Sequence, residues 1–309
     1  MNIHDRMTRR RFLTTIGAVS AGLAFAQQIQ AEKRVPIKRP IPRSGETLPV
    51  IGMGTSGTFE IGNDSAARRR LAEVLRIFFD NGGTLIDSSP MYGSAEEVVG
   101  DLLKSVGKRG SPFIATKVWT YGRQDGIEQM QRSMRLLGVK VIDLMQVHNL
   151  RDWRTHLKTL REWKKEGKVR YIGITTSHGR FHEELEQIMR SEPLDFVQFS
   201  YSLEDRRAEK VLLPLAADRG IGTLINRPFE RGGLFGKVRS AKLPEWSKEF
   251  DCETWAQFFL KFVAAHPATT CVIPATAKER HMLDNMAAGF GRLPDADQRK
   301  RMIAYAAAL

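Results

Sequence analysis

Short apolar segments alternate with longer amphipathic segments along most of this 309-residue chain. The apolar segments have the length and composition of buried strands, and the intervening segments are long enough for helices. Eight strands are expected, with the sequences LPVIGM, TLID, PFIATK, VIDLMQV, VRYIGIT, DFVQFS, GTLIN and CVIP. This alternation predicts an α/β fold in which eight parallel strands and outer helices close into a single (β/α)8 TIM barrel.

Glycines at the expected ends of the helical segments agree with this prediction. Residues 66–81 carry an apolar helical face and are followed by two glycines, which is a typical helix stop. Gly138, Gly167 and Gly220 occupy the same position before three further strands. The alanine-rich segment 295–309 predicts a last helix on the outside of the barrel. An open dinucleotide-binding sheet is disfavoured, because no G-x-G-x-x-G motif follows the first strand.

The first 31 residues have the pattern of an export signal. Thr8-Arg9-Arg10-Arg11-Phe12-Leu13 precedes an apolar run over residues 16–25, and Ala24-Phe25-Ala26 is a candidate cleavage site. The segment resembles a twin-arginine signal peptide, with a chance basic and apolar N-terminus as the alternative. The resemblance implies export to the periplasm by the twin-arginine machinery. The apolar run has about half the length of a membrane-spanning helix, so no stable span is expected.

Residues 32–47 contain many Pro, Lys and Arg residues, and this composition predicts a linker without regular structure. The folded domain is expected to comprise residues 48–309. The whole chain has a formal net charge of +13 at pH 7. This charge suits an anionic ligand, a phosphorylated cofactor or simply a solvated basic surface. No motif of a nucleic-acid-binding module is present.

Two cysteines, Cys252 and Cys271, are too few for a disulfide framework, and both lie in apolar segments. We expect buried thiols without a catalytic role. No cluster of metal ligands is expected.

Four polar residues end, or closely follow, the predicted strands: Asp87, Tyr92, Lys117 and His148. The C-terminal ends of barrel strands meet at one mouth, so these side chains are expected to share a site. Three of them also have a simpler explanation: a turn acceptor for Asp87, a loop aromatic for Tyr92 and a core histidine for His148. Lys117 is harder to explain without an anion, because it ends an apolar run.

Together the four residues suggest an acid-base site. Asp87 would hold Lys117 charged, and Lys117 would lower the pKa of Tyr92 so that the phenol exchanges a proton near neutral pH. His148 would orient or polarise a carbonyl oxygen. The set has a proton donor but no nucleophile and no paired carboxylates, which disfavours a hydrolase. It suits carbonyl reduction with an external source of hydride.

These residues also carry a family resemblance. The stretch GGTLIDSSPMYGSAEEVVGDLLK, the lysine of PFIATK, the histidine of IDLMQVH and the segment VRYIGITT resemble the aldo-keto reductase family in order and spacing, from about residue 48 to residue 290. The resemblance implies an extended nicotinamide cofactor, NADPH with NADH possible, and reduction of a small aldehyde or ketone. Asp87, Tyr92, Lys117 and His148 match the catalytic tetrad of the family.

The resemblance also implies a set of cofactor-binding residues, which are Gly54, Thr55, Thr175, Thr176, Gln198, Arg227, Thr276, Lys278, Arg280 and Asn285. The chain departs from the family at three places. Thr175-Thr176 replaces the usual Ser-Asn pair, and Asn226-Arg227 stands where many relatives carry an aromatic residue. Lys278 and Arg280 stand near the place of the usual basic residues, where they would bind the ribose phosphate or remain exposed helix charges.

A barrel that binds a nicotinamide nucleotide or a partner protein without turnover is the alternative function. Export motivates it, because nucleotide is expected to be scarce outside the cytoplasm. Trp119, Tyr121 and Trp153 follow strand ends and would either line the substrate site or serve in packing.

Overall fold

A computed structural model describes residues 35–107 and 112–309 of the chain. The predicted signal peptide, residues 1–31, lies outside the described residues. Within them, no helix is long and apolar enough to cross a membrane. The compact unit that carries the expected domain spans Pro36–Leu309.

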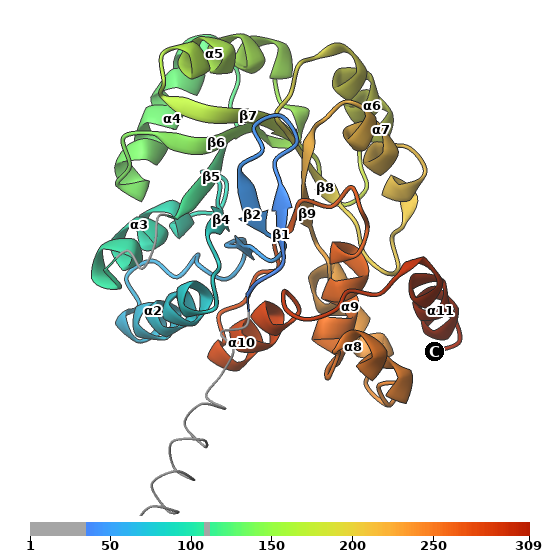
Figure 1. The fold of residues 1–309 in the computed structure, drawn as a ribbon. Coiled ribbons are helices and arrows are strands. Elements are labelled where there is room, and N and C mark those ends of the chain that lie inside the picture. Colours follow the sequence, from blue (N-terminus) through green and yellow to red (C-terminus); the bar gives the residue numbers. More distant parts are fainter. Residues whose placement is uncertain (1–34, 108–111) are drawn as a thin grey trace, which may run out of the picture. The chain divides into compact units, whose positions relative to one another are not determined.

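Eight parallel strands form the centre of this unit, and this confirms the predicted barrel (Figure 1). Each strand pairs with its neighbour in chain order, and bridges Ile51–Val272 and Gly54–Ala275 join the last strand region to the first. The strands are β3 (Met53–Gly54), β4 (Leu85–Asp87), β5 (Phe113–Val118), β6 (Ile142–Val147), β7 (Val169–Thr175), β8 (Phe196–Ser200), β9 (Gly222–Asn226) and β10 (Cys271–Val272).

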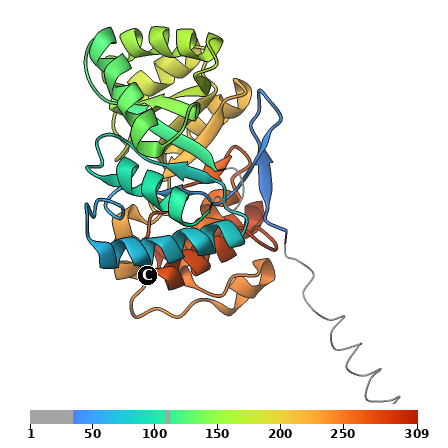
Figure 2. The ribbon, with the colours of Figure 1, turned by 90° about the vertical axis from the view of Figure 1, so that its left-hand side faces the viewer.

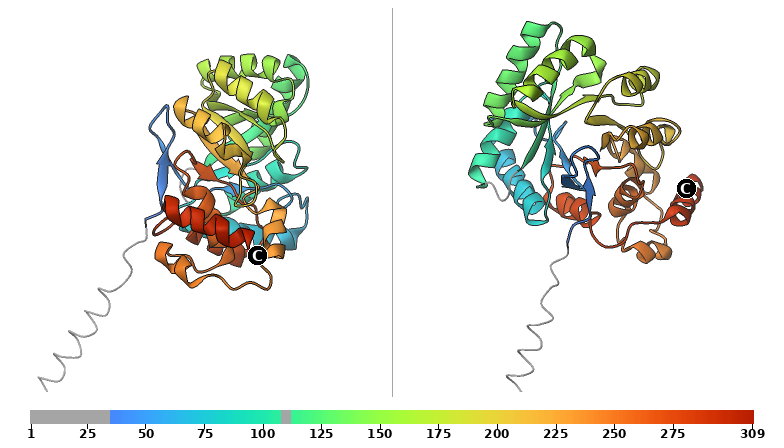
Figure 3. Two further views of the ribbon diagram at one scale, coloured as in Figure 1. Left: turned by 90° about the vertical axis from the view of Figure 1, so that its right-hand side faces the viewer. Right: turned by 45° about the horizontal axis from the view of Figure 1, so that its top comes forward.

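Helices surround the strands, as Figures 2 and 3 show from further sides. They are α2 (Ser65–Asp80), α3 (Ala95–Ser105), α4 (Arg123–Leu137), α5 (Trp153–Lys165), α6 (His182–Ser191), α7 (Leu212–Asp218), α8 (Gly233–Lys237), α9 (Trp255–Ala264), α10 (Glu279–Ala287) and α11 (Ala296–Ala307). Helix α4 ends at Gly138 with φ 68°, a left-handed conformation that favours glycine. Asp295 caps α11 in a capping box with Gln298.

The inward side chains of the barrel change from apolar to polar along the strands. A buried apolar layer consists of Ile41, Leu48, Leu85, Phe113, Ala115, Leu144, Tyr171, Phe196, Leu224, Cys271 and Ile273. Because successive strand residues alternate between the two faces, the residue two positions further on points inward as well. On five strands that residue is polar: Asp87, Lys117, Gln146, Gln198 and Asn226. The polar site therefore lies above the apolar layer, at the C-terminal ends of the strands.

A β-hairpin occupies part of the segment predicted to be a linker, residues 32–47, and this prediction was wrong. Strand β1 (Lys38–Pro40) pairs antiparallel with β2 (Thr47–Pro49), so the start of LPVIGM belongs to the hairpin and not to the barrel (Figure 1). Ile41 and Leu48 are at most 1% exposed and join the apolar layer. Their burial orders the segment despite its Pro and Lys content, and it closes the N-terminal end of the barrel.

Candidate active site

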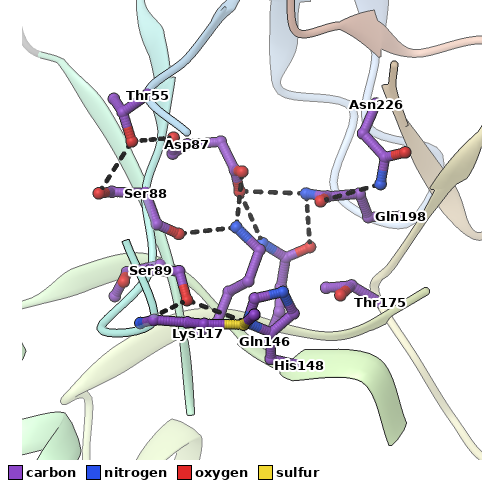
Figure 4. A network of polar contacts seen from close by, with 12 residues as sticks. Thr55, Asp87, Ser88, Ser89, Lys117, Gln146, His148, Thr175, Gln198 and Asn226 are labelled. Atoms are coloured by element: carbon purple, nitrogen blue, oxygen red, sulfur yellow. Dashed lines mark hydrogen bonds and ion pairs between the residues drawn. The ribbon is translucent and has the colours of Figure 1, made fainter. Parts of the chain in front are cut away.

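A buried ion pair lies at the centre of the polar site (Figure 4). Lys117 Nζ on β5 is 2.6 Å from Asp87 Oδ2 at the end of β4, and it also donates to the carbonyl oxygen of Ser88 at 2.7 Å. The lysine side chain is 0% exposed and the aspartate 3%. Burial by itself would lower the pKa of Lys117, but Asp87 and Tyr92 outweigh it and raise the pKa. The site therefore holds a charged lysine.

The carboxylate of Asp87 is fixed from its other side by two amides. Gln146 Nε2 and Gln198 Nε2 each donate to Asp87 Oδ1 at 3.1 Å (Figure 4). Thr55 Oγ1 donates to the main-chain oxygen of Asp87 at 3.0 Å. Both carboxylate oxygens thus have partners, which hold the group in one orientation against Lys117.

Tyr92 lies in the loop after β4, with its ring 5.0 Å from Lys117 Nζ. Burial raises the pKa of Tyr92, and Lys117 opposes this through its charge and a hydrogen bond without cancelling it. The expected net lowering toward neutral pH was therefore wrong in direction, because the loop buries the phenol as well as placing it beside an ammonium group. A protonated phenol is the form that a proton donor needs, and Lys117 is placed to stabilise the phenolate left behind.

His148 follows β6 and meets Tyr92 edge to face, with ring centroids 5.8 Å apart. Burial, together with the charges of Lys117 and Arg151, lowers the pKa of His148 to about 2, so the imidazole is neutral. Its Nδ1 lies 3.0 Å from Ser89 Oγ, which already accepts a hydrogen bond from Met91 N. The Ser89 hydroxyl hydrogen is then free for Nδ1, which leaves Nε2–H as a donor to a substrate oxygen.

Three residues of this network escaped the sequence-based prediction: Ser88, Ser89 and Gln146. Gln146 had a recognisable signal, since it stands two residues before His148 in an apolar strand and therefore on the same face. The serines had none, because Ser-Ser after a strand is an ordinary turn sequence.

The predicted cofactor residues form two groups, and the first adjoins the tetrad. Gln198 donates to Gln146 Oε1 at 3.3 Å, and Asn226 donates to Gln198 Oε1 at 3.3 Å and to the main-chain oxygen of Thr176 at 2.9 Å. Thr175 Oγ1 accepts from Asn149 N at 3.4 Å. This chain of amides links the ends of β7, β8 and β9 to Asp87.

Two polar atoms next to this chain of amides are buried without partners. They are Thr176 Oγ1 and Arg227 Nε, two of the seven such side-chain atoms among the described residues. Arg227 has φ 54°, and its Nη2 lies 3.6 Å from Glu230 Oε2. Gly54 lies close to the neighbouring strand region after β10, where a Cβ would come within 2.9 Å of the Ile273 carbonyl oxygen. Unsatisfied donors and acceptors beside amides suit a polar ligand such as a nicotinamide nucleotide.

The second group lies on the loop after β10 and on α10, with no described contact to the tetrad. Thr276 Oγ1 accepts a hydrogen bond from Lys278 N at 3.2 Å, and Lys278 is the N-cap of α10. Lys278 and Arg280 are exposed, and within the described residues neither forms an ion pair. Asn285 is buried at 2% exposure. The structure thus bonds Thr55 and Gln198 to Asp87 of the tetrad and places Thr175 against Asn149, next to His148. It leaves the second group, Thr276, Lys278, Arg280 and Asn285, apart from the tetrad.

Aromatic residues border His148 on one side. The Trp119 ring lies 6.4 Å from the His148 ring, while Tyr121 is 66% exposed. Trp153 lies on α5 and donates to Glu184 Oε1 on α6 at 3.2 Å. Trp119 therefore lies beside the site, whereas Trp153 packs between helices.

The two cysteines and the metal-ligand residue types offer no second catalytic site among the described residues. Cys252 and Cys271 are buried as expected, and burial raises the pKa of Cys252 to about 12. In residues 35–107 and 112–309, no cluster of three or more His, Cys, Asp or Glu side chains could hold a metal ion. A hollow of about 480 Å³, lined in part by Arg43, Lys164 and Tyr171, lies at the opposite end of the barrel.

The sequence and the structure are similar to those of known proteins. A sequence model of the Aldo/keto reductase family matches residues 50–301. Aldo-keto reductase YhdN of Bacillus subtilis is 33% identical over 210 residues, which are 61% of this chain and 60% of that protein. Methylglyoxal reductase YeaE of Escherichia coli is 29% identical over 263 residues, covering 81% and 89%. An aldo/keto reductase from Klebsiella pneumoniae, solved in complex with NADP and acetate, superposes with a TM-score of 0.69 at 24% identity, covering 84% and 92%.

Proposed function

This chain belongs to the aldo/keto reductase family, and from that membership we propose that it is a reductase that uses NADPH to convert an aldehyde or ketone into an alcohol. From its N-terminal sequence we propose that it is exported. The observation that carries the proposal is the buried Asp87–Lys117 pair beside a protonated Tyr92 and a neutral His148. Such a set can deliver a proton to a carbonyl oxygen, and no side chain can deliver the hydride.

A nicotinamide cofactor held beside Thr175, Thr176 and Gln198 would supply the hydride that reduces the carbonyl carbon. His148 Nε2–H donates a hydrogen bond to the carbonyl oxygen and orients it toward Tyr92. The Tyr92 hydroxyl transfers its proton to that oxygen as the C=O bond becomes a C–O single bond. Lys117, held by Asp87, stabilises the phenolate until Tyr92 recovers a proton from solvent.

The residues that would hold the cofactor follow from the two groups at the site. Thr175, Thr176 and Gln198 would bind the carboxamide of the nicotinamide with hydroxyl and amide groups. Lys278 and Arg280, at the first turn of α10, would bind the phosphate on the adenosine ribose. Positive charge there supports NADPH over NADH. The Klebsiella protein, which was solved with NADP, supports the same choice.

The purified chain without residues 1–31 tests the enzymatic proposal. We expect it to bind NADPH and to oxidise it when aldehydes, ketones or quinones are added, followed as the loss of NADPH absorbance. NADH should bind more weakly, because it lacks the phosphate that the basic residues of α10 would meet. Equal affinity for both nucleotides would overturn the cofactor preference. NADPH binding without oxidation across the panel would favour the alternative, a binding barrel without turnover.

The export proposal rests on Arg9 and Arg10 in the N-terminal sequence. The double variant Arg9→Lys/Arg10→Lys keeps the charge but removes the arginine pair. In a bacterium with twin-arginine export, we expect the full chain in the periplasmic fraction and the double variant in the cytoplasmic fraction. Arg11→Lys is the matched control and should be exported. An unchanged distribution of the double variant would refute this route.

A further inference from the structure

Arg151 is a positively charged side chain stacked on aromatic rings beside the candidate site. Its Cζ lies 4.0 Å from the centroid of the Trp119 ring and 5.0 Å from that of Tyr121. The Trp119 ring in turn lies 6.4 Å from the ring of His148. The indole therefore lies near both the guanidinium and the imidazole that would hold the carbonyl oxygen.

Arg151 has no acidic partner within the part of the chain that the structure describes. The neighbouring carboxylate, Asp152, accepts a hydrogen bond from Gly122 N at 2.8 Å and is engaged there. Some arginines of the barrel do pair with a carboxylate, such as Arg123 with Glu162 at 2.7 Å. A partly buried guanidinium whose donors lack an anion is suited to receive one from a ligand.

The backbone around Arg151 is strained. Asn149, Leu150 and Asp152 have φ values of 51°, 56° and 46°, in the left-handed region that favours glycine. Leu150 has no polar group to stabilise this conformation, in contrast to Asn149 and Asp152. Such strain tends to occur where it holds a functional group in place. Here it turns the chain directly after His148 so that Arg151 lies against Trp119.

We propose that Arg151 recognises a carboxylate on the carbonyl substrate, so that the preferred substrates are aldehydes or ketones that carry an acid group. Stacking on Trp119 and Tyr121 fixes the plane of the guanidinium, which can then bind a carboxylate through two parallel hydrogen bonds. The carbonyl group would lie at His148 and the carboxylate at Arg151, with the linking atoms against the indole. This inference rests on the proposed reductase function and adds the substrate class to it.

Two aldehydes of equal shape test the inference: 4-carboxybenzaldehyde and its uncharged counterpart 4-carbamoylbenzaldehyde. We expect the wild-type protein with NADPH to favour the acid in kcat/KM by at least about tenfold, as for a hydrogen-bonded ion pair. In Arg151→Gln this ratio should fall to about one. Arg154→Gln is the matched control, since Arg154 also stacks on an indole, that of Trp153 at 4.2 Å, and its ratio should equal that of wild type.

Calorimetric binding of both aldehydes separates this inference from the reductase function. Tighter binding of the acid that is lost in Arg151→Gln supports the inference, even if no NADPH is oxidised and the reductase proposal fails. Efficient reduction of both aldehydes without preference in the wild type overturns the inference and leaves the reductase proposal standing. An unchanged preference in a folded Arg151→Gln variant overturns it as well.

Discussion

Tyr92→Phe is expected to lower kcat by about 100-fold to 10,000-fold while the Kd for NADPH stays within about twofold of wild type. The substitution removes the hydroxyl that would donate the proton and keeps the ring that packs against His148 and Lys117. Steady-state turnover with an aldehyde and a fluorescence titration with NADPH measure the two quantities separately.

Tyr171→Phe is the control for this variant. Tyr171 lies in the apolar layer at the other end of the barrel, so loss of its hydroxyl should leave turnover unchanged.

The pH profile of kcat gives a second check. Since the pKa of Tyr92 is raised and that of His148 is about 2, neither group titrates between about pH 6 and 9, and kcat should be flat there. Normal turnover by Tyr92→Phe would show that the Tyr92 hydroxyl is not the proton donor.

Lys117→Met is expected to lower the free energy of unfolding by about 3–5 kcal/mol and to abolish turnover. The methionine fills similar space, but it leaves the buried Asp87 carboxylate, whose side chain is 3% exposed, without its cation. Urea unfolding followed by circular dichroism measures the loss. Lys300→Met is the control, since the Lys300–Asp297 pair is 77% and 90% exposed and its removal should change stability by less than about 1 kcal/mol.

The double variant Lys117→Met/Asp87→Asn shows whether the loss comes from the unpaired charge. Asparagine fits the same space and can still accept from Gln146 and Gln198 through its oxygen. We therefore expect the double variant to be more stable than Lys117→Met alone. Losses that simply add would show that the two side chains contribute independently.

The barrel and the centre of the site could be predicted because both follow from local periodicity. Strand residues two apart share a face, so a polar residue that ends an apolar strand points into the barrel. Asp87 and Lys117 follow this rule directly, and the structure joins them in an ion pair. Gln146 follows it as well, but a single glutamine suggests no chemistry until its partner Asp87 is known.

The features that escaped prediction depend on contacts between distant segments. The hairpin β1–β2 has the composition of a linker and is ordered by the burial of Ile41 and Leu48 in the barrel. The pKa of Tyr92 is set by how deeply a loop is covered, which spacing does not reveal. The turn that carries Arg151 includes Leu150 in the left-handed region, a conformation that its sequence does not predict.

The closed N-terminal end of the barrel has a consequence for ligand binding. Because Ile41 and Leu48 close the N-terminal end of the barrel, reactants reach the polar site only from the C-terminal end. Whichever ligand binds nearer the apolar layer must then arrive first and depart last. While the outer ligand is bound, it would block the release of the inner one. An inner and an outer ligand that share the C-terminal entrance would therefore bind in a fixed order and leave in the reverse order.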